Sequence, residues 1–431
     1  MITSKEHIVN YFNSGIRDTK DFKIGIEHEK FLFDQNKNQR ADYKTVLKMF
    51  DELSEFGWEP IMEMRNIIGL QKEGKNITLE PGNQIELSGD KLNNIHEACS
   101  ESHDYLFELQ QVTKKLGLKI VSAGFDPIST LSEVPNNPKQ RYKVMTRDMP
   151  NGGSLSLDMM YRTCGTQLNL DYKSEKDFIK KFKIINSLVP ISIALFANSS
   201  IVEKKNSGFM SYRSKVWQET SRGGLPEVFF DNMNFEKYAD FAINFPLLFI
   251  QNDKEYLSGK NYTFSDFMNG KIKEINNKLP TEDDLATHLS TIFTENRLKK
   301  YIELRSMDTC GWDCLCSGPA FNTGILYGNL DETFELISKW DENKIINAYF
   351  EAPKKGFNTE LMGKDLLYWS SLLLNLSKKG LENRDVLNKS GENEAKFLNH
   401  LEKLIDNKTT NADHMINKFS KDGNLTELYD K

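Results

Sequence analysis

The chain of 431 residues predicts an α+β fold, in which helices pack against an antiparallel sheet. Two observations lead to this fold class. Four short stretches alternate apolar side chains with acids, amides or arginine, which is the period of a β-strand. Elsewhere apolar residues recur at helical spacing, and from about residue 331 onward the chain has helical patterns without further strands of this kind.

The four alternating stretches cover residues 24–31, 84–87, 167–170 and 301–305. Because successive side chains on a strand point to opposite faces, each stretch gathers its polar residues on one face. These residues are Glu27 with Glu29, Gln84 with Glu86, Gln167 with Asn169, and Glu303 with Arg305. If the four strands share one antiparallel sheet, that sheet has one apolar face and one face lined with carboxylates and amides.

An acid-lined face of this kind predicts a site for divalent metal ions and a polar substrate. Several carboxylates in one place repel each other unless a cation neutralises them. Magnesium prefers oxygen ligands and often bridges nucleotide phosphates to carboxylates, so the face suits ATP-driven chemistry with more than one cation. The alternative is four unrelated amphipathic strands whose polar edges face water.

The other segments follow in order as helices, strands and loops. We expect helices over 5–18 and 41–56, strands and turns over 57–89, a helix over 92–116, a strand over 118–124, a loop with three prolines, and a helix from 174 to about 198. Gly117 would end the long helix, and Ser174 would begin the later one as a cap. No linker separates domains, so we expect a catalytic domain at 1–330 and a helical C-terminal region at 331–431 packed on it.

Composition excludes several classes of partner. Acids outnumber bases by 62 to 56, the net charge is −6 and the bases are scattered, which argues against nucleic acid. No apolar run approaches the length of a membrane span. The N-terminus lacks the pattern of a signal or transit peptide. We therefore expect a soluble cytoplasmic protein without a membrane partner.

Five cysteines in 431 residues cannot form a disulfide framework, and their odd number fits a reducing compartment. Cys310, Cys314 and Cys316 form one cluster, but a zinc site would need a fourth ligand. We expect free thiols there.

Two arginines in loop-like settings are candidates for binding anionic groups. They are Arg141 in the segment 138–142 and Arg213 in the segment 208–217. The planar guanidinium binds carboxylates and phosphates with two parallel hydrogen bonds. The alternative is that either arginine is an ordinary surface residue. No Ser/His/Asp or Cys/His arrangement stands out, which disfavours acyl-enzyme hydrolysis.

Eight ordered motifs across about residues 22–328 resemble the plant and proteobacterial type of glutamate–cysteine ligase. The motifs are Gly25-Ile-Glu-His-Glu-Lys-Phe31, Leu79-Glu-Pro-Gly-Asn-Gln-Ile-Glu-Leu-Ser-Gly89, Gly153-Ser-Leu-Ser-Leu-Asp-Met-Met160, Arg162-Thr-Cys164, Gln167-Leu-Asn-Leu-Asp171, Leu195-Phe-Ala-Asn-Ser199, Thr291-Ile-Phe293 and Arg297-Leu-Lys-Lys-Tyr-Ile-Glu-Leu-Arg305. The resemblance implies a glutamine synthetase-like half-barrel, a curved antiparallel sheet with helices on its convex side.

The resemblance also implies roles for individual residues. The implied magnesium ligands are Glu27, Glu29, Glu86 and Glu303, with Glu80 as a neighbour. Gln167, Asn169, Trp217 and Arg162 would bind substrate, and Arg141, Arg213 and Arg305 would act on the reacting groups. The cofactor would be two or three Mg²⁺ ions, with ATP as co-substrate.

The implied activity is ligation of the glutamate γ-carboxylate to cysteine through a γ-glutamyl phosphate, the first step of glutathione biosynthesis. The partners would be glutamate, cysteine and ATP, and the protein a monomer or homodimer. Two alternatives stay open: a γ-glutamyl ligase that uses another amine, and a catalytically inactive binding protein of the same fold.

Overall fold

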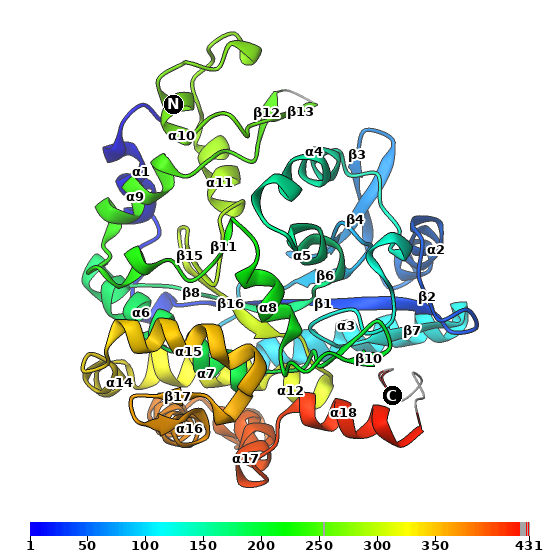
Figure 1. The fold of residues 1–431 in the computed structure, drawn as a ribbon, viewed down its shortest axis with the longest axis vertical. Helices are drawn as coiled ribbons and strands as arrows, with labels where there is room; N and C mark the ends of the chain where they lie inside the picture. Colours follow the sequence, from blue (N-terminus) through cyan, green and yellow to red (C-terminus); the bar gives the residue numbers. More distant parts are fainter. Residues whose placement is uncertain (253–254, 423–427, 429, 431) are drawn as a thin grey trace.

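The computed structural model describes residues 1–252 and 255–422 together with Leu428 and Asp430. Its centre is a ten-stranded sheet, in which eight strands follow the order β15-β16-β8-β1-β6-β5-β4-β3 while β2 and β7 also pair with β1. Figure 1 shows β1 crossing the middle of the molecule. The strands are β1 (Ile24–Asp34), β2 (Gln39–Arg40), β3 (Glu59–Glu63), β4 (Asn66–Lys72), β5 (Lys75–Leu79), β6 (Ile85–Ser88), β7 (Leu118–Val121), β8 (Gly165–Leu170), β15 (Asn296–Leu298) and β16 (Ile302–Asp308).

The four strands expected from the alternating pattern are neighbours in this sheet. They stand in the order β16-β8-β1-β6, and each pair is antiparallel. The register aligns Glu29 with Glu86 and Glu27 with Gln167. Because paired residues share a face, the predicted antiparallel sheet with a carboxylate- and amide-lined face is confirmed.

Eighteen α-helices surround the sheet in the described residues. They are α1 (Lys5–Asn13), α2 (Tyr43–Ser54), α3 (Ile95–Leu116), α4 (Gln140–Asp148), α5 (Ser156–Arg162), α6 (Glu175–Ser187), α7 (Val189–Leu195), α8 (Tyr212–Gln218), α9 (Phe235–Asn244), α10 (Phe264–Met268), α11 (Glu282–Ser290), α12 (Trp312–Leu315), α13 (Ser317–Thr323), α14 (Leu330–Ile337), α15 (Glu342–Lys355), α16 (Leu366–Arg384), α17 (Asn399–Asp406) and α18 (Asn411–Asp422). The remaining strands lie outside the large sheet. Those of two residues are β9 (Ile201–Val202), β10 (Lys205–Asn206), β11 (Gly223–Gly224), β14 (Phe293–Thr294), β17 (Glu360–Leu361) and β18 (Lys364–Asp365), and those of four residues are β12 (Phe249–Asn252) and β13 (Glu255–Ser258).

Local signals explain where the main helices begin and end. Asn94 caps α3 by accepting the amide of Glu97, and Gly117 ends it with a left-handed φ of 66°. Ser174 caps α6 as expected. The single helix expected over 174–198 is instead two helices, because Pro190 has no amide hydrogen to continue α6 and lies in the first turn of α7.

The face of the sheet opposite the acids carries the main core. Ile26, Leu168 and Leu304 belong to one apolar cluster with buried residues of α6, α7 and α13. Lys30 is also fully buried on this side of β1, where its Nζ donates to the carbonyl oxygen of Cys310 at 2.6 Å. In Figure 1 the C-terminal helices, yellow to red, gather along one side of the molecule.

The expectation of free thiols in the cluster of Cys310, Cys314 and Cys316 is wrong, and so is the expectation that the cysteines form no disulfide framework. Cys99 on α3 is bonded to Cys316 at the start of α13, and Cys310 is bonded to Cys314 across the loop that leads into α12. Cys164 is the free and buried cysteine. The pairing of Cys99 joins residues 217 positions apart, so no spacing rule in the sequence could reveal it.

None of the helices in the described ranges combines the length and apolar character that crossing a bilayer requires.

Candidate active site

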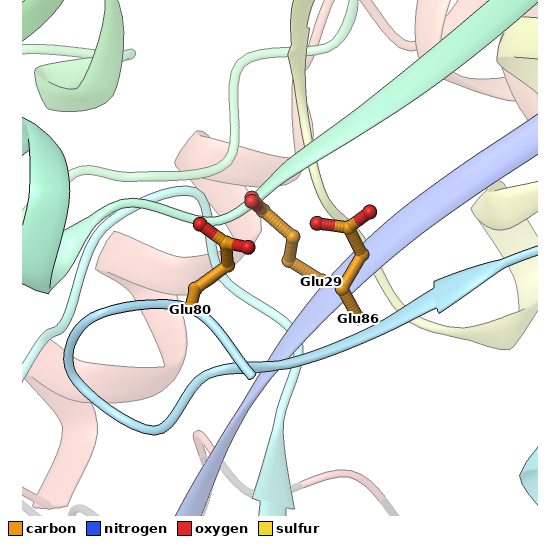
Figure 2. Close-up of side chains that lie close together, drawn as sticks. All are labelled: Glu29, Glu80 and Glu86. Atoms are coloured by element: carbon orange, nitrogen blue, oxygen red, sulfur yellow. The ribbon is translucent and has the colours of Figure 1, made fainter. Parts of the chain in front are cut away.

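Three carboxylates converge on the polar face of the sheet. Glu29 stands on β1, Glu86 on the neighbouring strand β6, and Glu80 in the turn that joins β5 to β6. One oxygen from each lies within 4.8 Å of the others, and Figure 2 shows the side chains gathered around a common space. Carboxylate oxygens in this arrangement are suitable ligands for Mg²⁺.

The turn that carries Glu80 is held by main-chain and side-chain bonds. The amide of Glu80 donates to the carbonyl of Gln84, and Asn83 adopts a left-handed φ of 59° to close the turn. Gln84 was expected to share the acid face, but it precedes β6, and its side-chain amide binds the carbonyl oxygens of Met160 and Thr163. Gln84 therefore shapes the loop and does not line the site.

Glu29 and Glu86 resist ionisation. Burial, followed by the charge of Glu80, raises the pKa of Glu29 to about 7, although Arg213 and Arg305 act in the opposite direction. Burial and the charges of its acidic neighbours also raise the pKa of Glu86 well above its usual value. A bound cation would offset the mutual repulsion of these acids.

The other two predicted metal ligands have different surroundings. Glu27 accepts a hydrogen bond from Nδ2 of Asn169 at 2.7 Å. Glu303 is enclosed by Arg297, Lys299 and Arg305, at 2.5, 3.0 and 2.5 Å. Burial alone would raise the pKa of Glu303, but these cations hold it well below the usual value. The structure thus separates Glu303 from the cluster of Glu29.

Arg213, Arg305 and Trp217 form the cationic part of the site. Both guanidinium groups lie over the indole of Trp217, with 5.0 and 5.3 Å from their carbon atoms to the ring centroid. Nη2 of Arg213 donates to the carbonyl of Arg305 at 2.8 Å, and Nη1 of Arg305 donates to Oε1 of Gln167. A Cβ at Gly165 would lie 2.7 Å from Nη2 of Arg213, so only glycine leaves room for this side chain.

Arg141 approaches the acids from α4. Its Nη2 donates to the hydroxyl of Tyr142 at 3.1 Å, and this hydroxyl lies 3.2 Å from Oε1 of Glu80. Lys139, which the sequence did not single out, is buried nearby, and burial lowers its pKa to about 8. Both predicted arginines lie in the first turn of a helix, α4 for Arg141 and α8 for Arg213, and not in loops.

The resemblance implied that Arg162 binds substrate, but its contacts are those of a residue that holds the fold together. It forms ion pairs with Asp158 at 2.8 Å and Glu203 at 3.1 Å, and its guanidinium carbon lies 4.5 Å from the centroid of Phe125. None of these partners belongs to the acid face. A substrate-binding role for Arg162 stays a prediction.

Several buried polar atoms of the site have no hydrogen-bond partner. They are Nε of Arg141, Nε of Arg213, Nε of Arg305, Nε1 of Trp217 and Oδ1 of Asn169. A buried donor without a partner costs free energy, and such atoms in a native protein call for an explanation. Four of the five atoms are donors. Recognition of an anionic substrate or phosphate requires such free donors.

Helix α15, from the C-terminal part of the chain, supports the segment that carries Arg213. The carbonyl of Pro353 accepts from the amides of Met210 and Ser211 at 2.8 and 3.0 Å. It can do so because carbonyls in the last turn of a helix lack intrahelical partners. The hydroxyl of Tyr349 also donates to the buried Glu295 at 3.1 Å.

Sequence reasoning missed Asp308. Strict alternation from Glu303 and Arg305 puts residue 308 on the opposite face, but β16 has an irregularity between Leu304 and Met307. Beyond it, Asp308 pairs with Gly165. A bulge adds one residue to a strand and so shifts the alternation, and this brings Asp308 onto the polar face. No signal in the sequence of β16 marks this bulge.

Comparison with known proteins defines the class of enzyme. The chain is 38% identical over 419 residues to a glutamate–cysteine ligase, chloroplastic, of Nicotiana tabacum, covering 96% of this chain and 79% of the relative. It is 38% identical over 422 residues to glutamate–cysteine ligase A, chloroplastic, of Oryza sativa subsp. japonica, covering 96% and 85%. The protein is therefore a ligase.

The family follows from a match along most of the chain. The model of glutamate–cysteine ligase family 2 (GCS2) matches residues 23–431. The chain belongs to this family, as the ordered motifs indicated, and the expected ligase activity is confirmed at the level of glutamate–cysteine ligation.

A solved structure shows the same fold at low sequence identity. A glutamate–cysteine ligase from Francisella tularensis in complex with AMP has a TM-score of 0.52 at 13% identity, covering 96% of this chain and 87% of that chain.

The expectation of a cytoplasmic protein is wrong when judged by these relatives. The ligases from N. tabacum, O. sativa and Arabidopsis thaliana are all named as chloroplastic. The expectation rested on the lack of a recognisable targeting pattern at the first residues, which proved an insufficient basis.

Proposed function

We propose that this ligase uses ATP and Mg²⁺ to join the γ-carboxylate of glutamate to the amino group of cysteine, through γ-glutamyl phosphate. The observation that carries the proposal is the cluster of Glu29, Glu80 and Glu86 next to arginines with unpartnered donors. The F. tularensis structure, which contains AMP, supports an adenine nucleotide as co-substrate. The product would enter glutathione biosynthesis.

The donor set fits magnesium. Glu29, Glu80 and Glu86 offer only oxygen ligands, and burial together with the charges of neighbouring acids raises the pKa of Glu29 and of Glu86, which a bound cation would offset. Glu27 and Glu303 would serve second and third ions, although Glu303 would first have to exchange its bonds to cationic side chains. Bound Mg²⁺ would neutralise the negative charge of the nucleotide phosphates.

The chemistry has two steps. A γ-carboxylate oxygen of glutamate attacks the terminal phosphorus of ATP, and the bond to ADP breaks. The amine of cysteine then attacks the acyl carbon, phosphate leaves with that carboxylate oxygen, and the amine loses a proton. An ionised carboxylate is a poor acceptor for an amine, whereas an acyl phosphate has a good leaving group.

The chain's own residues would bind and orient these groups. Arg213 and Arg305 present buried Nε–H donors that would hold a substrate carboxylate or the transferring phosphate. Arg141, held by Tyr142 beside Glu80, would add positive charge at the other side of the cluster. Asn169 would accept a hydrogen bond at Oδ1, and Gln167 would keep Arg305 in place.

We also propose the finer architecture implied by the resemblance. The sheet would be a curved half-barrel with its acid face concave and α3, α6, α7 and α13 on the convex side. Residues 1–330 would form the catalytic domain, with 331–431 packed on it, in a monomer or homodimer. The apolar cluster that α6, α7 and α13 form with the sheet supports the placement of these helices.

An isotope experiment tests the acyl phosphate. Glutamate labelled with oxygen-18 in the γ-carboxylate should transfer one labelled oxygen to inorganic phosphate, measured by mass spectrometry, with ADP as the nucleotide product. Label in AMP, with release of pyrophosphate, would overturn the proposal. A panel of amines under the same conditions would reveal a different acceptor, and lack of any glutamate-dependent ADP release would indicate an inactive binding protein.

A further inference from the structure

The buried carboxylate of Asp308 organises the segment that leads into α8. Its Oδ2 accepts from the amide of Asn198 at 2.8 Å and from Oγ of Ser199 at 2.6 Å. Its Oδ1 accepts from Oγ of Ser211 at 2.9 Å. Asp308 is only 3% exposed, so these bonds are shielded from water and strengthened by the low dielectric of their surroundings.

Two routes lead from Asp308 to Arg213. Oγ of Ser199, which donates to Asp308, accepts from the backbone amide of Arg213 at 3.1 Å. Oγ of Ser211 caps α8 by accepting the amide of Ser214 at 3.1 Å, and Arg213 lies in this first turn. Both hydroxyl groups can point their hydrogens at Asp308 because its carboxylate only accepts.

The backbone around these bonds leaves space for them. A Cβ at Gly124 would collide with the carboxylate of Asp308, and a Cβ at Gly165 would meet the guanidinium of Arg213. Burial raises the pKa of Asp308, and the charge of Arg213 acts in the opposite direction, so the two charges act on each other. No ion pair joins them among the described residues, and the coupling runs through the serines.

We propose that Asp308 is a positioning residue for the ligase reaction, which fixes the first turn of α8 and thereby the direction of the Arg213 guanidinium. The inference rests on the proposed role of Arg213 at the substrate. The hydrogen bonds of Asp308 itself go to Asn198, Ser199 and Ser211. The bulge in β16 serves this role, because without it the side chain of residue 308 would point into the apolar core.

A double-mutant cycle tests the coupling. Asp308→Asn replaces one carboxylate oxygen, which accepts hydrogen bonds, by an NH₂ group, which donates them. Because the neighbouring groups are donors too, at least one bond to Asn198, Ser199 or Ser211 is lost. We expect kcat/KM to fall about 10- to 100-fold in the wild-type background. In the Arg213→Lys background the same change should cost less than about threefold, because the group that Asp308 positions is already absent.

Controls separate positioning from stability. Asp177→Asn removes another buried carboxylate, which binds Lys181 at 2.9 Å in α6, far along the chain from α8. It should lower the melting temperature and have the same effect on kcat/KM in both backgrounds. If Asp308→Asn does not fold, Ser199→Ala removes the link to Arg213 while keeping the carboxylate, and it should show the same dependence on Arg213.

The outcomes are distinct. Equal losses from Asp308→Asn, or from Ser199→Ala if that variant is needed, in both backgrounds would overturn the positioning role. Wild-type kinetics of Arg213→Lys would remove the basis of the inference by excluding Arg213 from the site. Lack of γ-glutamylcysteine formation by the wild-type enzyme would instead refute the proposed function.

Discussion

The carboxylate cluster should contribute to the unfolding free energy of the metal-free protein an amount that falls as pH rises. Glu29 has a pKa of about 7 in the folded protein, against 4.5 for an exposed glutamate. Between these values the folded chain keeps a proton that the unfolded chain releases. Because the unfolded state then binds fewer protons at this group, the stability that Glu29 contributes decreases with pH across this window. The difference between the two pKa values corresponds to about 3 kcal/mol.

Glu80→Gln is the informative perturbation. The charge of Glu80 raises the pKa of both Glu29 and Glu86, so its removal should lower both values and flatten the pH dependence by about 1–2 kcal/mol. The fold should persist, since Gln occupies nearly the same volume. Activity should fall, because one of the three proposed metal ligands is lost.

The assay is urea unfolding at a series of pH values between about 4.5 and 7, with a chelator and again with excess Mg²⁺. Magnesium should remove most of the cluster's contribution in the wild type, because it takes the place of the retained proton. Glu55→Gln, an exposed change at the end of α2, is the control and should follow the wild type. Burial lowers the pKa of His28 and of His288, and these groups act in the opposite direction over the same range, so the quantity compared is the difference in unfolding free energy between Glu80→Gln and the wild type. A difference that does not change with pH in the metal-free protein would refute the reasoning.

Three further predictions concern the cationic side of the site and the disulfide. Arg213→Lys keeps the charge but loses the planar fork, so it should cost about 2–4 kcal/mol of transition-state stabilisation, or ~30- to 1000-fold in kcat/KM; steady-state kinetics like those of the wild type would contradict this. Gly165→Ala should displace Arg213 and reduce activity at least about tenfold, whereas Gly311→Ala, whose Cβ would meet no atom within 4 Å, should be silent in the same assay. Breaking the bond between Cys99 and Cys316 by the double change to serine should lower the unfolding free energy by about 2–5 kcal/mol, and a melting temperature equal to that of the oxidised wild type would argue against the bond.

Much of the sheet could be predicted from alternation alone. The period of two placed Glu27 with Glu29, and Gln167 with Asn169, on shared faces, and the observed register keeps them there. Alternation fails where the backbone departs from a regular strand. The bulge in β16 moves Asp308 onto the polar face, and a strand pattern has no means of indicating an inserted residue.

Contacts between different elements of the fold also could not be predicted from the sequence. The resemblance implied that Glu303 binds metal, a role that stays a prediction, and the sequence did not indicate that Arg297 on the adjacent strand β15 pairs with it directly in the register. Strand partners decide which charges meet, and residue spacing within one strand does not contain that information. The same limit hid the bond between Cys99 and Cys316.

The bonds from α15 to the segment before α8 have a consequence for protein engineering. Pro353 and Tyr349 lie beyond the expected boundary at residue 330, yet their atoms brace the amides of Met210 and Ser211 and the carboxyl of Glu295. In a chimera with the C-terminal helices of a relative, different residues would make the hydrogen bonds that support the turn carrying Arg213. The kinetics of the chimera would then depend on residues that never meet a substrate, and directed evolution of such chimeras would have to sample α15 together with α8.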